Sequence, residues 1–299
     1  MGHRAKGQSV QGQRAKGQPV QGQRATRQRA KGQRPVKPAV RWRRLTALAI
    51  AVVGLAVLVP RFTGTPRPVV ATCAADTGAG GYLVTVEQAV NAATIAAAGR
   101  RSGLGNHAIT VALATAFQES NLRNLPYGDR DSLGLFQQRP SQGWGTPEQI
   151  LQPRLASAAF YLRLGKVPGW ATLPLTEAAQ AVQRSAAPLA YAQWEGPARA
   201  LARAFTGEVP AGLTCRLPPG DRPAAAATVL TAAVADLGPQ ALQVGGSTAA
   251  TDWSQASWLV AHAQELFLRS VSCRGRTWTA DSGRWQPDPA VPATGVSFH

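Results

Sequence analysis

The sequence predicts a mainly helical (α+β) domain behind a single N-terminal transmembrane helix, followed by a small C-terminal α/β module. Three observations support this fold class. Residues 45–60 form an uncharged apolar run, apolar residues recur at helical spacing between residues 84 and 205, and two helical patterns precede hairpin-like segments after residue 223. The predicted parts are a basic tail (1–44), an anchor (45–61), a linker (62–81), a central domain (82–215), a second linker (216–223) and the C-terminal module (224–299).

Positive charge is concentrated in the N-terminal tail. The chain of 299 residues has a net charge of +17, and residues 1–44 contain nine Arg and four Lys with no Asp or Glu, which leaves +4 for all the rest. The tail contains an imperfect ten-residue repeat with almost no apolar side chains, which predicts disorder. Nothing in it reads bases, so anionic lipid head groups rather than nucleic acid are its expected partner.

The apolar run at residues 45–60 is short for a membrane span. Sixteen residues give roughly 24 Å of helix against a bilayer core of roughly 30 Å. The core of a signal peptide is the alternative, but the preceding basic region is long and no A-x-A cleavage site follows. The arginines before the run place that side in the cytoplasm. We therefore expect an uncleaved single-pass anchor in the cell membrane, with the N-terminus cytoplasmic and the central domain extracytoplasmic.

Three cysteines, Cys73, Cys215 and Cys273, exclude a disulfide-dense scaffold, and no C-x-x-C or Cys/His cluster suggests a metal site. Cys73 and Cys215 lie just outside the two ends of the central domain. A bridge between them is one prediction for a protein outside the cell. Three unrelated thiols are the alternative, and Cys273 is left over either way.

The central domain shows helix signals from its first residues. A capping box at Thr85–Gln88 begins a helix that should stop at Gly99, and Asn106 should cap the next helix. The only strand-like segment is Leu133–Gln137. Further helices are expected at residues 147–164, 175–185 and 188–205.

The C-terminal module combines two expected helices, at residues 224–236 and 254–267, with a hairpin-like segment. Its turns are expected at Arg274-Gly275 and Ser282-Gly283. Four tryptophans are concentrated here, and a role in the core is favoured over stacking on sugars: Trp253, Trp258, Trp278 and Trp285.

The chemistry-bearing stretch is residues 112–145, where an apolar helix ends in Glu119 and a loop with Asp129 and Asp131 follows. Cleaving a glycosidic bond requires a carboxylic acid that keeps its proton near neutral pH, and burial provides this by disfavouring the charged form. Glu119 has an apolar helix behind it and lies at the negative end of the helix dipole. An ordinary exposed Glu at a helix end is the alternative.

The motifs in this stretch resemble those of the lysozyme-like superfamily, specifically soluble lytic transglycosylases and goose-type lysozymes. Glu119-Ser120 matches the end of their catalytic helix, and residues 134–137, Gly-Leu-Phe-Gln, match their Gly-Leu-Met-Gln hairpin with Phe in place of Met. Residues 127–130 are similar to the goose-type loop, with Asp129 as its Asp. The resemblance covers residues 84–206.

The resemblance implies an enzyme that cuts the β-1,4 bond between N-acetylmuramic acid and N-acetylglucosamine in peptidoglycan, with Glu119 as general acid and base and no cofactor or metal. A hydrolase would also use Asp129 to position water, whereas Asp131 is expected to be a structural loop residue. The residues expected to contact the glycan are Ser120, Gly134, Leu135, Phe136, Gln137, Trp144 and Tyr191.

Two departures from the family pattern leave alternatives open. Arg139 stands where goose-type enzymes have an Asp, which weakens the hydrolase hypothesis. The Ala-Tyr-Asn motif of transglycosylases is missing, and Gln183 occupies the position of its Tyr. Tyr191 or Tyr161 would then have to supply the hydroxyl. A non-catalytic, peptidoglycan-binding scaffold is the alternative function, and the sequence predicts no oligomeric state.

Overall fold

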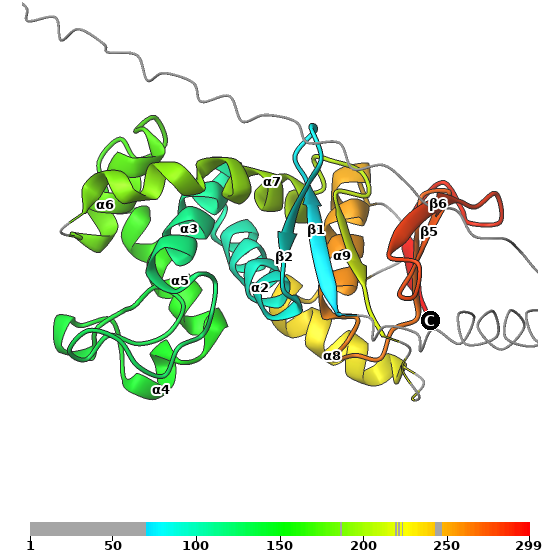
Figure 1. Ribbon diagram of the computed structural model, residues 1–299, viewed down its shortest axis with the longest axis horizontal. Helices are drawn as coiled ribbons and strands as arrows, with labels where there is room; N and C mark the ends of the chain where they lie inside the picture. Colours follow the sequence, from blue (N-terminus) through cyan, green and yellow to red (C-terminus); the bar gives the residue numbers. More distant parts are fainter. Residues whose placement is uncertain (1–69, 186, 219, 221, 223, 243–246) are drawn as a thin grey trace, which may run out of the picture. The chain divides into compact units, whose positions relative to one another are not determined.

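The structure is a computed structural model that describes residues 70–299 apart from 186, 219, 221, 223 and 243–246 (Figure 1). The tail predicted at residues 1–44 and the anchor predicted at 45–61 lie outside the described residues. Within the described part, no helix is both long enough and apolar enough to cross a membrane. The described residues form one compact unit.

The predicted fold class is wrong. The described residues are about half helical and form two small antiparallel sheets, instead of a mainly helical domain behind a transmembrane helix with a separate α/β module. The strands are three to five residues long, which is too short for an alternating pattern to stand out from the background. Sequence patterns therefore overestimated the helical share.

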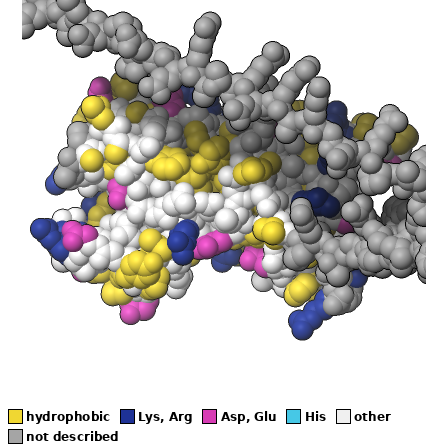
Figure 2. Space-filling view, viewed as in Figure 1, with side chains coloured by type: hydrophobic (Ala, Val, Ile, Leu, Met, Phe, Trp, Pro, Cys, Tyr) yellow, Lys and Arg dark blue, Asp and Glu magenta, His cyan; other side chains and the backbone are white. Residues whose placement is uncertain are grey.

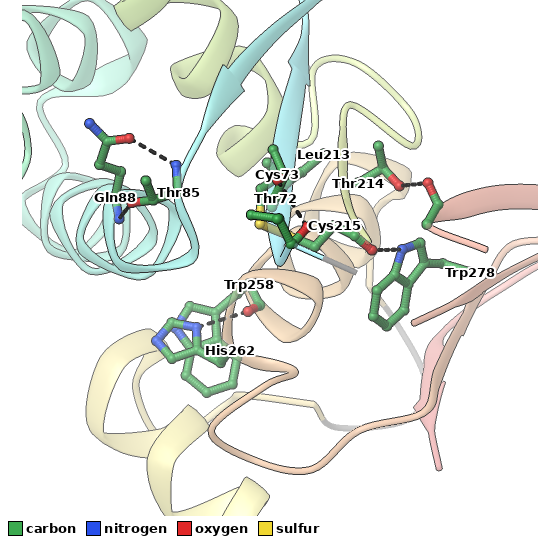
Figure 3. The surroundings of a disulfide bond; sticks show 12 residues. Thr72, Cys73, Thr85, Gln88, Leu213, Thr214, Cys215, Trp258, His262 and Trp278 are labelled. Atoms are coloured by element: carbon green, nitrogen blue, oxygen red, sulfur yellow. Dashed lines mark hydrogen bonds between the residues drawn. A yellow bond between two sulfur atoms is a disulfide. The ribbon is translucent and has the colours of Figure 1, made fainter. Parts of the chain in front are cut away.

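The first sheet is built largely from residues expected to be linkers. It contains β1 (Thr72–Asp76), β2 (Gly81–Val84) and β3 (Leu213–Arg216) in the order β2-β1-β3. Cys73 and Cys215 are opposite each other in the β1–β3 register, and a disulfide joins them (Figure 3). The sheet thus brings the two ends of the predicted central domain together.

Helix α2 (Val86–Ser102) begins at the predicted capping box, in which the Thr85 hydroxyl accepts from the Gln88 N–H and the Gln88 side chain accepts from the Thr85 N–H. It continues past Gly99, where we expected it to stop. A Cβ at Gly99 would lie 2.6 Å from the Tyr161 hydroxyl oxygen. The glycine therefore permits close packing of α2 on the helix that contains Tyr161 and does not end α2.

Two of the helices expected between residues 105 and 206 differ from the prediction. The expected helix at residues 147–164 is two helices because Pro153 begins the second, and α3 begins at Gly105 with Leu104 as its cap, not Asn106. The elements are α3 (Gly105–Ser120), η1 (Pro140–Gln142), α4 (Pro147–Ile150), α5 (Pro153–Leu164), α6 (Leu175–Gln183), η2 (Pro188–Trp194) and α7 (Glu195–Thr206).

The C-terminal elements are α8 (Ala226–Leu237), α9 (Ala249–His262) and a sheet of β4 (Ser270–Cys273), β5 (Arg276–Thr279), β6 (Arg284–Pro287) and β7 (Val296–Phe298), in the order β6-β5-β4-β7. Both predicted turns are confirmed by the β4–β5 and β5–β6 pairings. Trp253, Trp258 and Trp278 are buried, and Trp285 packs edge-on against Trp253. The core role of the tryptophans is confirmed.

Helix α9 joins the C-terminal elements to the helices before them. It packs against both α2 and α7, and the Ser254 hydroxyl donates to the Phe205 carbonyl at 2.6 Å. In Figure 1, α9 lies to the right of β1 and β2. The second sheet lies on the other side of α9, away from α3 and α6. All these elements share one hydrophobic core.

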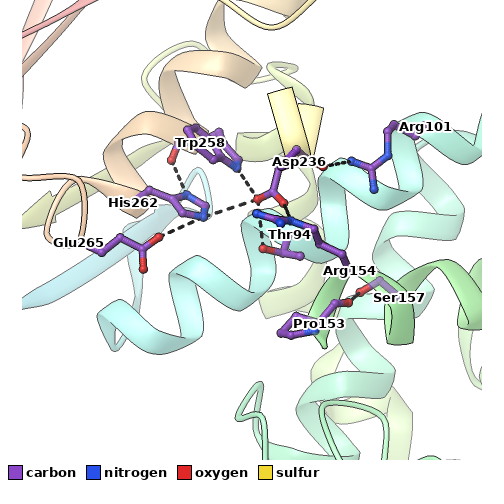
Figure 4. Close-up of polar contacts among 10 residues, drawn as sticks. Thr94, Arg101, Pro153, Arg154, Ser157, Asp236, Trp258, His262 and Glu265 are labelled. Atoms are coloured by element: carbon purple, nitrogen blue, oxygen red, sulfur yellow. Dashed lines mark hydrogen bonds and ion pairs between the residues drawn. The ribbon is translucent and has the colours of Figure 1, made fainter. Parts of the chain in front are cut away.

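A buried polar cluster around Asp236 connects α8 to three other helices (Figure 4). The Asp236 carboxylate, 1% exposed, accepts from the Trp258 indole at 2.9 Å and the Thr94 hydroxyl at 3.3 Å. It also forms an ion pair with Arg154. His262 lies 3.7 Å away, and burial lowers the pKa of its ring, which favours the neutral form. The carboxylate is thus the common acceptor of α2, α5 and α9.

Replacing Asp236 with Ala is expected to lower the free energy of unfolding by about 3 kcal/mol, because the buried indole and hydroxyl donors would lose their acceptor. Asp129→Ala is the control, since that side chain is 93% exposed and its loss should change stability by less than about 0.5 kcal/mol. Urea denaturation of the full chain measures both. Equal stabilities of the two variants would contradict the structural role of the cluster.

Candidate functional site

A cleft of about 1060 Å³ opens where the end of α3 meets the loop at residues 129–144 and the ends of α5 and α6. Its lining is mostly polar and charged. The residues that line it are Glu119, Asp129, Arg130, Ser132, Gln137, Arg139, Gln142, Trp144, Arg163, Lys166, Val167, Pro168, Ala181, Val182, Gln183, Arg184 and Ser185. Four of the catalytic and glycan-contacting residues expected from the sequence lie in this lining: Glu119, Asp129, Gln137 and Trp144.

Glu119 lies in the last turn of α3 with its carboxylate at the cleft. Its Oε1 accepts a hydrogen bond of 2.9 Å from the Tyr191 hydroxyl. Burial raises the pKa of Glu119 above its ordinary value of 4.5, and hydrogen bonds from Gln183 and Tyr191 offset part of that rise. A carboxyl in this setting can hold its proton at a higher pH than an exposed one and can still accept it back.

Ser120 fixes the loop that follows the helix. Its hydroxyl donates to the Leu135 carbonyl at 2.7 Å and to the Ala116 carbonyl at 3.1 Å, and the residue is buried. The chain then turns through Asn121, whose positive φ of 54° ends α3. Ser120 therefore holds the Gly-Leu-Phe-Gln segment against the helix end and does not line the cleft.

The Gly-Leu-Phe-Gln segment forms a tight turn closed by the Leu133–Gln138 bridge. Gly134 has a positive φ of 75°, and a Cβ there would lie 2.7 Å from the Ile150 carbonyl oxygen, so the position favours glycine. Leu135 and Phe136 are fully buried, and Phe136 stacks on Phe160. Only Gln137 of this segment lines the cleft.

The two loop carboxylates differ in their surroundings. The Asp129 side chain is 93% exposed and lies 4.0 Å from Arg130. Asp131 accepts from Arg139 at 2.6 Å and from the Ser141 N–H at 2.8 Å, and these bonds hold the pKa of its carboxyl well below the usual range. Asp131 is thus a structural loop residue, and it neutralises Arg139 beside the cleft.

The hydroxyl that contacts Glu119 belongs to Tyr191 in η2, which is not the position of the family's Ala-Tyr-Asn motif. Gln183 occupies that motif position, and its side chain donates to the Phe136 carbonyl at 2.8 Å. Tyr161 is remote, because its hydroxyl donates to the Ile95 carbonyl. Burial and the nearby Glu119 carboxylate raise the pKa of Tyr191, so this phenol acts as a neutral hydrogen-bond donor.

Trp144 lines the cleft with Arg163 stacked on its ring, the guanidinium carbon 3.6 Å from the ring centroid. Arg163, Lys166 and Arg184 also line the cleft. These three residues were not predicted as site residues because no motif contains them. They come together only because the ends of α5 and α6 face the same loop.

The described residues contain no group of three or more His, Cys, Asp or Glu side chains that could hold a metal ion. The chemistry that they do support is proton transfer by Glu119 beside a polar cleft of about 1060 Å³. No protein-family model matches the chain, and no curated protein sequence matches it.

Proposed function

We propose that this protein is a peptidoglycan-cleaving enzyme of the lytic transglycosylase type. The observation that carries the proposal is the partly buried Glu119 carboxyl, which lines the cleft and accepts from the Tyr191 hydroxyl at 2.9 Å. The resemblance of Glu119-Ser120 and Gly134–Gln137 to that family supports the choice of substrate. The Cys73–Cys215 disulfide supports an extracytoplasmic location, since such bridges persist in oxidising compartments.

The proposed mechanism uses one carboxyl for two proton transfers. Glu119 gives its proton to the oxygen that links N-acetylmuramic acid to N-acetylglucosamine, and the bond from that oxygen to C1 breaks. The C6 hydroxyl of the muramic acid residue then bonds to C1, and its proton passes to the Glu119 carboxylate. The product is a 1,6-anhydro end, and Glu119 is protonated again without any water being consumed.

The surroundings of Asp129 favour this route over hydrolysis. A hydrolase needs a second carboxylate that is held at the reacting carbon to activate water or to stabilise positive charge. Among the described residues, Asp129 is the other carboxylate that lines the cleft. Its side chain is 93% exposed, and no hydrogen bond to another side chain holds its carboxylate in place.

Incubating the full chain with purified peptidoglycan and identifying the products by mass spectrometry tests the proposal. We expect muropeptides with 1,6-anhydro ends, and an Asp129→Asn variant should release them at a rate close to that of the wild type. Reducing ends, together with loss of release in Asp129→Asn, would show a hydrolase. Binding to insoluble peptidoglycan without any released product would show a non-catalytic wall-binding protein.

Replacing Tyr191 with Phe is expected to lower the cleavage rate by about tenfold, because one hydrogen bond to the reacting carboxyl is lost. That bond lowers the pKa of Glu119, so its removal should move the alkaline limb of the pH–rate profile to higher pH. Tyr127→Phe is the control, as Tyr127 is 64% exposed. A lower rate with an unshifted profile would indicate that Tyr191 has only a packing role.

A further inference from the structure

The short helix η2 is attached to the end of α3 at two neighbouring residues. Tyr191 donates to Oε1 of Glu119 at 2.9 Å. The Gln193 side chain and the Trp194 indole both donate to Oε1 of Gln118, at 3.1 and 2.9 Å. These bonds fix where the Tyr191 oxygen lies, but they do not decide in which direction its proton points.

Ser185 is the residue that acts on the Tyr191 oxygen. It lies between α6 and η2 and lines the same cleft as Glu119. Its carbonyl accepts from the Gln180 side chain at 2.8 Å, and its hydroxyl oxygen accepts from the Ala187 N–H at 3.0 Å. A hydrogen bond between the Ser185 and Tyr191 side chains offsets part of the rise in the pKa of Tyr191, which is the effect of a donor on a phenol oxygen. Ser185 is therefore the donor in this bond.

The bonds from Ala187 to Glu119 form a chain that runs in one direction. A backbone N–H can only donate, so the Ser185 oxygen is the acceptor at the first step. The single proton of Ser185 then points to Tyr191, and the single proton of Tyr191 points to Oε1 of Glu119. Donors aligned in this way strengthen one another by about 10–30% per bond.

We infer that Ser185 is a positioning residue for Glu119 that acts through Tyr191: its hydroxyl aims the phenol proton at Oε1 and so reserves Oε2 for the proton that Glu119 transfers. The role in transfer rests on the proposed function. Without Ser185, the phenol can turn and accept a proton from Glu119. The acid proton would then lie on Oε1, against Tyr191, where it cannot reach the glycosidic oxygen.

The first test measures peptidoglycan cleavage by the full chain as a function of pH. Ser185→Ala should lower the rate about threefold and move the alkaline limb of the profile to higher pH, because a weaker bond from Tyr191 stabilises the Glu119 carboxylate less. Ser185→Thr keeps a hydroxyl and should behave as the wild type. Ser102→Ala is the control, since Ser102 is an exposed residue at the end of α2 whose hydroxyl bonds to the Gly99 carbonyl. Equal losses in the Ala and Thr variants with an unshifted profile would overturn the inference.

A change in the charges around the cleft is the competing cause of a shifted profile. The other charged side chains that line the cleft are Asp129, Arg130, Arg139, Arg163, Lys166 and Arg184. Arg184 is next to Ser185, so a displaced guanidinium would also change the pKa of Glu119. That effect would persist when Tyr191 is replaced by Phe, whereas an effect carried by the hydrogen-bond chain would vanish. We therefore expect Ser185→Ala to change nothing in the Tyr191→Phe background, and an equal loss in both backgrounds would overturn the inference.

The second test measures the pKa of Glu119 without any substrate. Its carboxyl carbon is followed by ¹³C NMR in the full chain and assigned by its absence from Glu119→Gln. The pKa should be higher in Ser185→Ala than in the wild type, and equal in Tyr191→Phe and the double variant. Exposed Asp and Glu side chains, several of which lie on the face shown in Figure 2, are the internal references and should titrate unchanged.

The two tests separate the inference from the proposed function. If Ser185→Ala raises the pKa of Glu119 but the wild type releases no product from peptidoglycan, the proposed function fails and the positioning of Glu119 by Ser185 stands. If the wild type cleaves peptidoglycan and Ser185→Ala leaves the pKa of Glu119 unchanged, the inference alone is overturned.

Discussion

Replacing Glu119 with Gln is expected to lower peptidoglycan cleavage by about 1000-fold, within the range by which a positioned general acid and base accelerates a reaction. The substitution keeps the size of the side chain and an oxygen that accepts from the Tyr191 hydroxyl, whose bond to Glu119 is 2.9 Å long. It removes only the exchangeable proton. Release of soluble muropeptides from purified peptidoglycan by the full chain measures the effect.

Glu177→Gln is the matched control, because Glu177 is an exposed residue in the first turn of α6. It should cleave at the wild-type rate. Equal release by the Glu119 variant and the wild type would contradict any catalytic role for this carboxyl.

The same substitution carries an expected gain in stability that depends on pH. Because burial raises the pKa of Glu119 above 4.5, the folded state holds this proton more tightly than the unfolded state does. The protonated Glu119 therefore contributes its full stability to the folded state below about pH 4. This contribution is lost as the pH rises through the raised pKa of Glu119. Glu119→Gln cannot lose a proton, so it should be more stable than the wild type at pH 7 and equal to it near pH 4. Denaturation at the two pH values checks this, and a constant difference would show that the carboxyl is not destabilised by burial.

Removing the disulfide is expected to have the largest effect on stability. The bridge joins Cys73 and Cys215 across a sequence separation of 142 residues, and loops of this size correspond to about 5 kcal/mol of stabilisation in chain-entropy treatments. A Cys73→Ala, Cys215→Ala variant should lose about that much in guanidinium denaturation. Both residues are buried between neighbouring strands, and Ala adds no polar group there, so the loss of the bridge adds to a small cavity cost.

Cys273→Ala is the control for loss of a buried sulfur. Cys273 is a buried free thiol in β4, and its removal should cost about 1 kcal/mol through the cavity that it leaves. Dithiothreitol should destabilise this variant and the wild type equally, and it should have no effect on the double variant. A double variant no less stable than Cys273→Ala would contradict a stabilising bridge.

The position of Glu119 at a cleft could be predicted from the sequence. Its hydrogen bond from the Tyr191 hydroxyl could not. An apolar helix that ends in a carboxylate, followed by a glycine-containing loop, depends on local sequence, and local patterns can be read directly. The Tyr191 hydroxyl comes from 72 residues further along the chain. Tyr161 was an equal candidate in the sequence, and only the packing of α5 against α2 turns its hydroxyl toward Ile95.

The same limit explains the residues that were expected to touch the glycan but lie elsewhere. Ser120, Leu135 and Phe136 are buried, because a turn as tight as this one needs an anchor to the helix and an apolar base. A motif records that these residues occur together and does not say which of them support the loop. Arg163, Lys166 and Arg184 are the opposite case, since they line the cleft and no motif contains them.

Within the fold, the elements bounded by a capping box or a glycine turn were predicted best from the sequence. The capping box at Thr85 and the turn at Arg274-Gly275 specify local backbone geometry and are found as expected. Strand β3 was missed because its pairing with β1 is non-local. Strand β1 also pairs with its neighbour in sequence, β2, but a five-residue segment such as Thr72–Asp76 carries little propensity of its own.

The close packing of α9 against the end of α7 affects the stability of the cleft. The Ala250 carbonyl oxygen lies so near Gly207 that a Cβ there would be 1.9 Å from it, and the Ser254 hydroxyl bonds to the Phe205 carbonyl. Helix α7, in turn, packs closely on α3, the helix that carries Glu119. A chain shortened before Ala249 would leave the apolar side of α7 facing water. The cleft therefore depends on residues that never touch it, and the segment from 82 to 215 is not an autonomous unit that could be transplanted alone.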